Sequence, residues 1–98
     1  MGANSAVPAA IISLDDEARP TSLPLDGDSR LIKLQQLVGG FIETLCLPDN
    51  RCIVFNEEGK RGFHGINRAA TAIAHEAQMI LPGDYIPGIA VILPAEAL

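Results

Sequence analysis

One continuous apolar run near the C-terminus constrains the fold most strongly. Residues 88–93 read Gly-Ile-Ala-Val-Ile-Leu and include no polar side chain. The run has the length of a strand, and an apolar strand without polar alternation is typical of the centre of a sheet. We therefore expect a sheet with this run at its centre.

Two helices are predicted from periodicity and capping residues. The first is expected to begin at an N-cap at Asp28-Ser29 and to stop at Gly39-Gly40, since glycine is the usual helix stop. The second is expected to run from an N-cap at Asn67 to about residue 79, and its five alanines would let it lie close against a sheet. The apolar positions of the first helix recur at helical spacing: Leu31, Leu34, Leu37 and Val38.

Four further strands complete a small α+β domain. Residues 41–47 and 51–56 are rich in apolar and β-branched residues on either side of Pro48-Asp49-Asn50, which predicts an antiparallel hairpin. Residues 9–14 and 21–25 are shorter extended runs that can pair as a loose hairpin, the second at a sheet edge. The predicted order is ββαββαβ, in a small mixed or antiparallel sheet with two helices. We expect one domain over residues 9–98 and a disordered tail over residues 1–8, which show no periodicity.

Composition limits the kinds of partner and the cellular compartment that we expect for this protein. The net charge of −5 on 98 residues argues against direct binding to duplex nucleic acid, which requires many phosphates to be neutralised. Neither a signal peptide nor an apolar run near the roughly 18 residues of a membrane helix occurs, so we expect a cytoplasmic protein that does not enter the membrane. Its two cysteines would be reduced there. An aliphatic core without Trp leaves little room for a deep catalytic pocket.

Three blocks of sequence carry a resemblance to a known family. They are Leu-Gln-Gln-Leu-Val-Gly-Gly-Phe-Ile-Glu at residues 34–43, Asn-Glu-Glu-Gly-Lys at residues 56–60 and Asn-Arg-Ala-Ala-Thr-Ala at residues 67–72. In order and spacing they resemble domain of unknown function 3846, a small family of phages, plasmids and bacteria, over roughly residues 31–93. The resemblance implies a compact α+β unit in mobile-element biology and brings no catalytic residue with it. The long N-terminal part, rich in Pro and Asp, departs from the family.

The polar segment at residues 56–68 is the chemical centre of the chain. A helix N-terminus at Asn67, with Arg61 and Arg68 close in sequence, would present backbone N–H groups and positive charge to a phosphate or carboxylate. The alternative, which we favour, is a solvated turn followed by an ordinary Asn cap whose loss costs about 1 kcal/mol. The candidate ligand-binding residues are Lys60, Arg61, His64, Asn67 and Arg68.

Carboxylates and histidines give no catalytic or metal site. Glu57 and Glu58 are adjacent in an extended segment, so their side chains point to opposite faces and are not expected to converge on one ligand, with or without Glu43. His64 and His75 have no Cys near them at zinc-ligand spacing. We therefore expect no catalytic residue, no metal and no cofactor.

Cys46 and Cys52 form a C-x5-C pattern, which matches neither a zinc motif nor a redox motif. A three-residue loop over residues 48–50 would set the two cysteines directly opposite each other on one face of the hairpin. A two-residue turn at Asp49-Asn50 would separate them. In either register we expect two small buried apolar side chains, because free Cys is among the most often buried residue types.

Two functional hypotheses follow. The first is a non-enzymatic binding or regulatory accessory module of mobile-element type, which associates with a host or phage protein or with its own copy as a homodimer. Exposed sheet edges and the lack of any nucleophile, metal or cofactor motif favour it. The second is a protein that binds a small nucleotide-like anion with the loop and helix N-terminus at residues 60–68. An enzyme ranks third.

Overall fold

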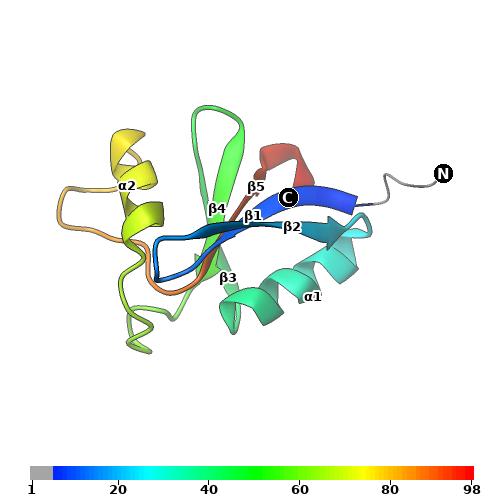
Figure 1. Cartoon of the computed structure of the whole chain (residues 1–98), viewed down its shortest axis with the longest axis horizontal. Helices are drawn as coiled ribbons and strands as arrows, with labels where there is room; N and C mark the ends of the chain where they lie inside the picture. The colour runs from blue at the N-terminus through cyan, green and yellow to red at the C-terminus, as the bar shows by residue number, and fades with distance from the viewer. Residues whose placement is uncertain (1–5) are drawn as a thin grey trace.

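The computed structural model describes residues 6–98, which form a five-stranded sheet with two α-helices (Figure 1). The elements in chain order are β1 (Ala6–Ile12), β2 (Ala18–Pro24), α1 (Gly27–Val38), β3 (Ile42–Cys46), β4 (Arg51–Asn56), α2 (Arg68–Glu76) and β5 (Ala90–Pro94), followed by a 3-10 turn over Ala95–Ala97. The predicted α+β class and the order ββαββαβ are confirmed. Within this part of the chain, no helix has the length and apolar character that a membrane crossing requires.

The apolar run at residues 88–93 supplies most of β5, the middle strand of the sheet. The strand order is β2-β1-β5-β4-β3, and every neighbouring pair is antiparallel. Pairing of β1 with β5 extends from Ile12 opposite Ala90 to Ala10 opposite Ile92. It stops there because the next hydrogen-bonding positions are two prolines, Pro8 and Pro94, which have no N–H to donate.

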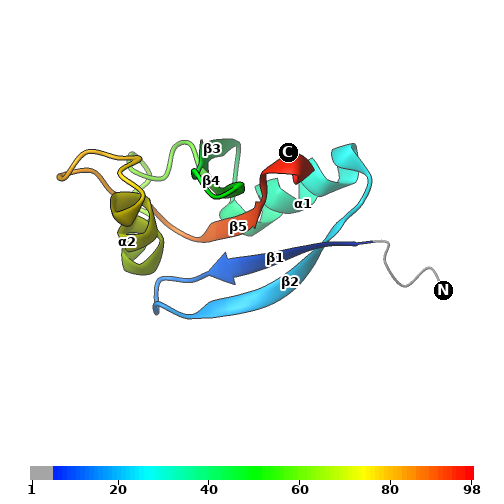
Figure 2. The ribbon, with the colours of Figure 1, turned by 90° about the horizontal axis from the view of Figure 1, so that it is seen from above.

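Side chains that alternate along the strands build two apolar clusters, one on each face of the sheet. The cluster on the α1 face contains Leu23, Leu34, Val38, Val54, Val91 and Leu93. The cluster on the α2 face contains Ile53, Phe55, Ala70, Ala74, Ile86 and Ala90. The central strands β4 and β5 contribute to both, which explains why their apolar residues do not alternate with polar ones. α2 lies toward one end of the sheet, so a helix covers only part of this face of the sheet (Figures 1 and 2).

Helix ends differ from the sequence-based expectation in two places. The N-cap of α1 is Asp26 and not Asp28-Ser29, because the Asp26 carboxylate reaches the Ser29 N–H at 2.9 Å and so begins the helix at Gly27. α1 ends as expected, with Gly39 in the left-handed region at φ 86°. The N-cap of α2 at Asn67 is confirmed. α2 ends at Glu76 and not near residue 79, because Gln78 takes a left-handed conformation at φ 57°.

The first strand begins earlier than expected. Residues 6–8 were expected in a disordered tail, but they belong to β1, where Val7 pairs with Leu23 of β2 and packs against the core. Small residues and Pro8 conceal this strand in the sequence, since they give almost no alternating signal. The expectation for residues 1–5 lies outside the described residues.

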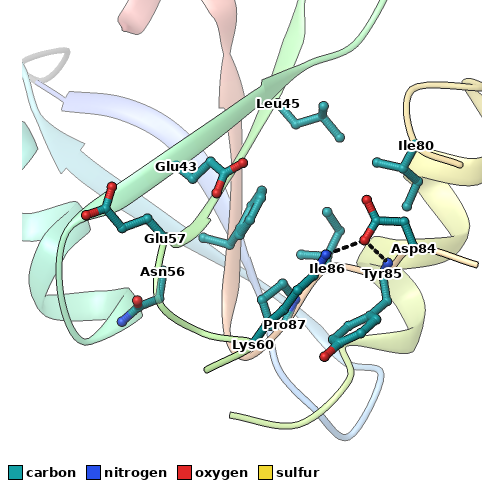
Figure 3. Close-up of a pocket in the computed structure, with 11 residues that line it drawn as sticks. Glu43, Leu45, Asn56, Glu57, Lys60, Ile80, Asp84, Tyr85, Ile86 and Pro87 are labelled. Carbon is teal, nitrogen blue, oxygen red and sulfur yellow. Dashed lines mark hydrogen bonds and ion pairs between the residues drawn. The ribbon is translucent and has the colours of Figure 1, made fainter. Parts of the chain in front are cut away.

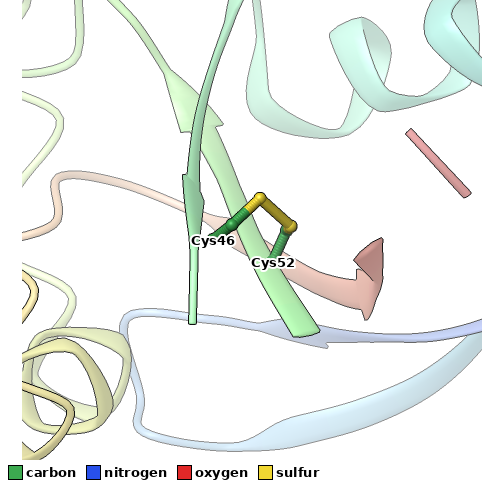
Figure 4. Close-up of a disulfide and its surroundings, with 2 residues drawn as sticks. All are labelled: Cys46 and Cys52. Atoms are coloured by element: carbon green, nitrogen blue, oxygen red, sulfur yellow. A yellow bond between two sulfur atoms is a disulfide. The ribbon is translucent and has the colours of Figure 1, made fainter. Parts of the chain in front are cut away.

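The two cysteines are joined in a disulfide across the β3–β4 hairpin (Figure 4). The three-residue loop is the one formed: the Leu47 N–H donates to the Arg51 carbonyl at 2.7 Å and Asn50 has φ 68°. Cys46 therefore lies directly opposite Cys52, with their Cα atoms 4.0 Å apart. The expectation of two buried, unbonded cysteines is wrong. Cys52 is fully buried, but Cys46 is exposed because β3 is an edge strand.

Candidate functional site

A compact turn over residues 57–65, here called the 57–65 turn, follows β4 and holds three of the five candidate residues. The buried side chain of Asn56 fixes its start, with Oδ1 accepting from the Glu58 N–H at 2.7 Å and Nδ2 donating to the Val38 carbonyl at 3.1 Å. Four backbone hydrogen bonds close the turn, each donated by an N–H group to a carbonyl: Gly59 to Asn56, Gly62 to Glu58, Phe63 to Lys60 and His64 to Gly59. The turn is thus tied both to the sheet and to the end of α1.

Phe63 stands at the tip of this turn. Its side chain is 92% exposed, more than any other large apolar side chain in residues 6–98. Its φ is 55°, in the left-handed region that bulky residues rarely occupy. The neighbours Gly62 and His64 line an open hollow of about 440 Å³ that Phe41, 70% exposed, also lines. Phe63 itself does not line this hollow, so its side chain is exposed outside it.

The backbone of Phe63 predicts a gain in stability on substitution. A left-handed conformation costs roughly 1–2 kcal/mol for an L-residue, and glycine removes this cost at an entropic loss of about 0.5–1 kcal/mol. We expect Phe63→Gly to raise the free energy of unfolding by about 0.5–1 kcal/mol in urea titrations. The control Phe63→Ala keeps the Cβ atom and should bring no such gain. A destabilised Phe63→Gly variant would contradict a strained Phe63.

The side chain of Lys60 lines a second, smaller hollow of about 110 Å³ (Figure 3). Its ammonium group forms an ion pair with Asp84 and lies 4.9 Å from the centroid of the Tyr85 ring. The hydrogen bond between the two charges raises the pKa of Lys60 and lowers the pKa of Asp84. The Asp84 carboxylate also accepts from the Tyr85 N–H at 2.8 Å. Lys60 therefore holds the segment after α2 against the turn.

Asn67 is fully buried, and its side chain bonds within the chain. Its Oδ1 accepts from the Ala70 N–H at 3.0 Å, and its Nδ2 donates to the carbonyls of Ile12 and Gly88 at 2.9 and 2.8 Å. These contacts join the start of α2 to the end of β1 and to the residues before β5. Asn67 thus connects three segments of the fold and has no surface exposed to a ligand.

The remaining candidates are separated. Arg68 forms an ion pair with Asp16 in the β1–β2 turn at 2.7 Å, with 76% of its side chain exposed. Arg61 is 87% exposed, lies 3.4 Å from Glu58, and lines the larger hollow together with His64. Of the five candidates, the structure brings only Arg61 and His64 to one hollow. Lys60 and Arg68 bind carboxylates of this chain, and Asn67 is inside the fold.

The glutamates near β4 also line different hollows. Glu57 and Glu43 line the smaller hollow, as Figure 3 shows, whereas Glu58 lines the larger one. Glu57 and Glu58 lie in a turn and not in the extended segment that was expected, but their side chains still line different hollows.

Sequence reasoning missed the exposed aromatic residues. Phe63 lies in the run Gly-Phe-His-Gly at residues 62–65, where flanking glycines indicate a turn and a phenylalanine has no core to enter. Phe41 follows Gly39-Gly40 and lies just before β3, whereas the sequence predicts it inside that strand. The glycines beside each aromatic residue were the available signal.

Comparison with known proteins places the chain in a family. Residues 9–93 match a family described as Domain of unknown function (DUF3846). The match includes β2 and most of β1, so the expectation that the N-terminal part departs from that family is wrong. No curated protein and no solved structure matches the chain. Because the match covers most of its length, the chain belongs to the family of domain of unknown function 3846.

Proposed function

We propose that this protein is a non-enzymatic module that acts through protein–protein association, with the 57–65 turn as its binding surface. The observation that carries the proposal is Phe63, an aromatic side chain 92% exposed on a backbone in the left-handed region. Strained backbone persists only where the surrounding structure enforces it, and it is concentrated at functional sites. An exposed aromatic side chain on a strained backbone adds nothing to the core, so we assign it to binding a partner.

The surroundings of Phe63 suit a protein partner. Aromatic and Arg side chains dominate the energetic centres of protein interfaces, and Arg61 is two residues away with 87% of its side chain exposed. Phe41, 70% exposed, lines one hollow together with Arg61 and so adds a second exposed aromatic side chain beside that residue. Hydrogen bonds already fix the turn, so little conformational entropy remains to be lost on binding.

The proposal includes the biological setting. Because the family resemblance is to phage, plasmid and bacterial proteins, we infer an accessory role in a mobile element and a cytoplasmic location. Reducing cytoplasm would open the disulfide between Cys46 and Cys52. Those residues lie outside the 57–65 turn, so its hydrogen bonds do not depend on the redox state of the pair.

A display library of random peptides tests this function. Peptides enriched on the wild-type protein are expected to bind Phe63→Ser at least about thirtyfold more weakly, the loss expected of a hot-spot residue. Arg68→Ser, a change at an exposed residue outside the turn, should leave their binding unchanged. Enrichment of no peptide, or equal binding to Phe63→Ser, would contradict the proposal.

A second candidate is the binding of a small nucleotide-like anion. The larger hollow favours it, because Arg61 and His64 both line it. A nucleotide at 100 times its dissociation constant would stabilise the fold by about 2.7 kcal/mol. A thermal shift with any member of a nucleotide panel, lost in Arg61→Ala, would favour this candidate over protein association.

A further inference from the structure

The two edges of the sheet differ in their capacity to accept another strand. β2 is one edge, and the hydrogen bond from the Ser13 N–H to the Glu17 carbonyl sets which of its residues face outward. With the register of β1 and β2, the outward backbone groups fall on Ala18, Pro20, Ser22 and Pro24. Two of these are prolines without an N–H, so β2 cannot continue a ladder.

β3, the opposite edge, has no such protection. Hydrogen bonds from Leu47 to Arg51 and from Glu57 to Phe41 enclose the strand and set its alternation. The N–H and C=O groups that point away from β4 are therefore those of Ile42, Thr44 and Cys46. All three positions can donate, and within residues 6–98 no strand pairs with this side of β3. Thr44 and Cys46 are exposed.

We infer that β3 pairs antiparallel with β3 of a second copy of this chain, about a twofold axis at Thr44. In this register Thr44 lies opposite Thr44, and Ile42 lies opposite Cys46. Every outward N–H and C=O of both strands then has a partner, and one sheet runs through both copies. In the disulfide-bonded protein the dimer is non-covalent, because Cys46 is bonded to Cys52 of its own chain.

The side chains of β3 favour a second copy over an unrelated strand. The outward positions lie symmetrically about Thr44, as a twofold interface requires. Glu43 is the one charged residue of β3, and the register places it opposite Leu45 and not opposite another Glu43. Like charges directly opposite each other destabilise a pair, whereas a Thr–Thr pair stabilises it. Phe41, 70% exposed just before β3, falls opposite Leu47 of the other copy.

Sedimentation equilibrium and residue-resolved amide exchange test the pairing together. The wild-type protein is expected to form a dimer as its concentration rises, with exchange slowing at the amides of Ile42, Thr44 and Cys46. Thr44→Pro should abolish both effects, because it removes the central outward N–H. Ser22→Pro, the matched change at an outward position of β2, should leave the dimer intact.

A second variant keeps the test usable if Thr44→Pro does not fold. The Thr44 N–H faces away from β4, so Thr44→Pro removes no bond of the monomer, and far-UV circular dichroism should be unchanged. If it does not fold, Thr44→Lys sets two like charges opposite each other and should also give a monomer. A wild-type monomer at the highest soluble concentration, or a dimer that persists in a folded Thr44 variant, would overturn the inference. The two proposals share only Phe41, just before β3, so the Phe63→Ser variant tests peptide binding separately from the dimer.

Discussion

Replacement of Asn67 by alanine is expected to lower the free energy of unfolding by roughly 3 kcal/mol or more. The change leaves three buried groups without their partner: the Ala70 N–H and the carbonyls of Ile12 and Gly88. Each buried polar group left unsatisfied costs about 1–3 kcal/mol. In a domain of this size the melting temperature should fall by roughly 12 °C or more. The cap alone, judged from sequence, accounts for only about 1 kcal/mol.

The matched control is Asp26→Ala at the N-cap of α1. Asp26 also accepts from a backbone N–H of its helix, but it is exposed and joins no other segment. Its loss should be clearly smaller than that of Asn67→Ala in the same urea titration. Equal losses for the two variants would show that Asn67 acts as a cap and nothing more.

Opening of the disulfide between Cys46 and Cys52 is expected to lower the free energy of unfolding by about 2 kcal/mol. The two residues are six apart in sequence, and a cross-link across a short loop restricts the unfolded chain by about this amount. Unfolding with and without a dithiol reductant measures the effect. The variant Cys46→Ser, Cys52→Ala should have the same free energy of unfolding as the reduced wild-type protein. The reductant should not change that value.

Intact-mass analysis decides whether the bond forms. Protein left to oxidise in air after purification should show the mass of the disulfide and bind no thiol reagent when unfolded, because Cys46 and Cys52 lie directly opposite each other. Two reactive thiols in that sample, or a reductant without effect on the oxidised protein, would contradict this account of the hairpin.

The fold was largely predictable because its strongest signals are local. The apolar run at residues 88–93 predicted the central strand, and Gly39 and Asn67 predicted one end of each helix correctly. Errors arose where several residues could serve the same role. Asp26 and Asp28 are both good caps, and only the backbone path selects Asp26. Pro8 suppressed the strand signal of β1, although its missing N–H falls where pairing with β5 ends.

The candidate site was less predictable because it depends on contacts between distant segments. Asn67 reads as a cap in sequence, and its bonds to Ile12 and Gly88 span 55 and 21 residues. The basic residues read as a cluster, but carboxylates from elsewhere in the chain bind two of them: Asp84 holds Lys60 and Asp16 holds Arg68. No local pattern shows such partners.

The most direct test of the proposed function is to locate a bound peptide on the protein. A peptide enriched on the wild-type protein should be titrated into ¹⁵N-labelled protein and followed by amide chemical shifts. We expect the largest changes within the 57–65 turn and at Phe41, with little change along β2. Changes centred on another surface, with the 57–65 turn unaffected, would contradict the claim that this turn is the binding site.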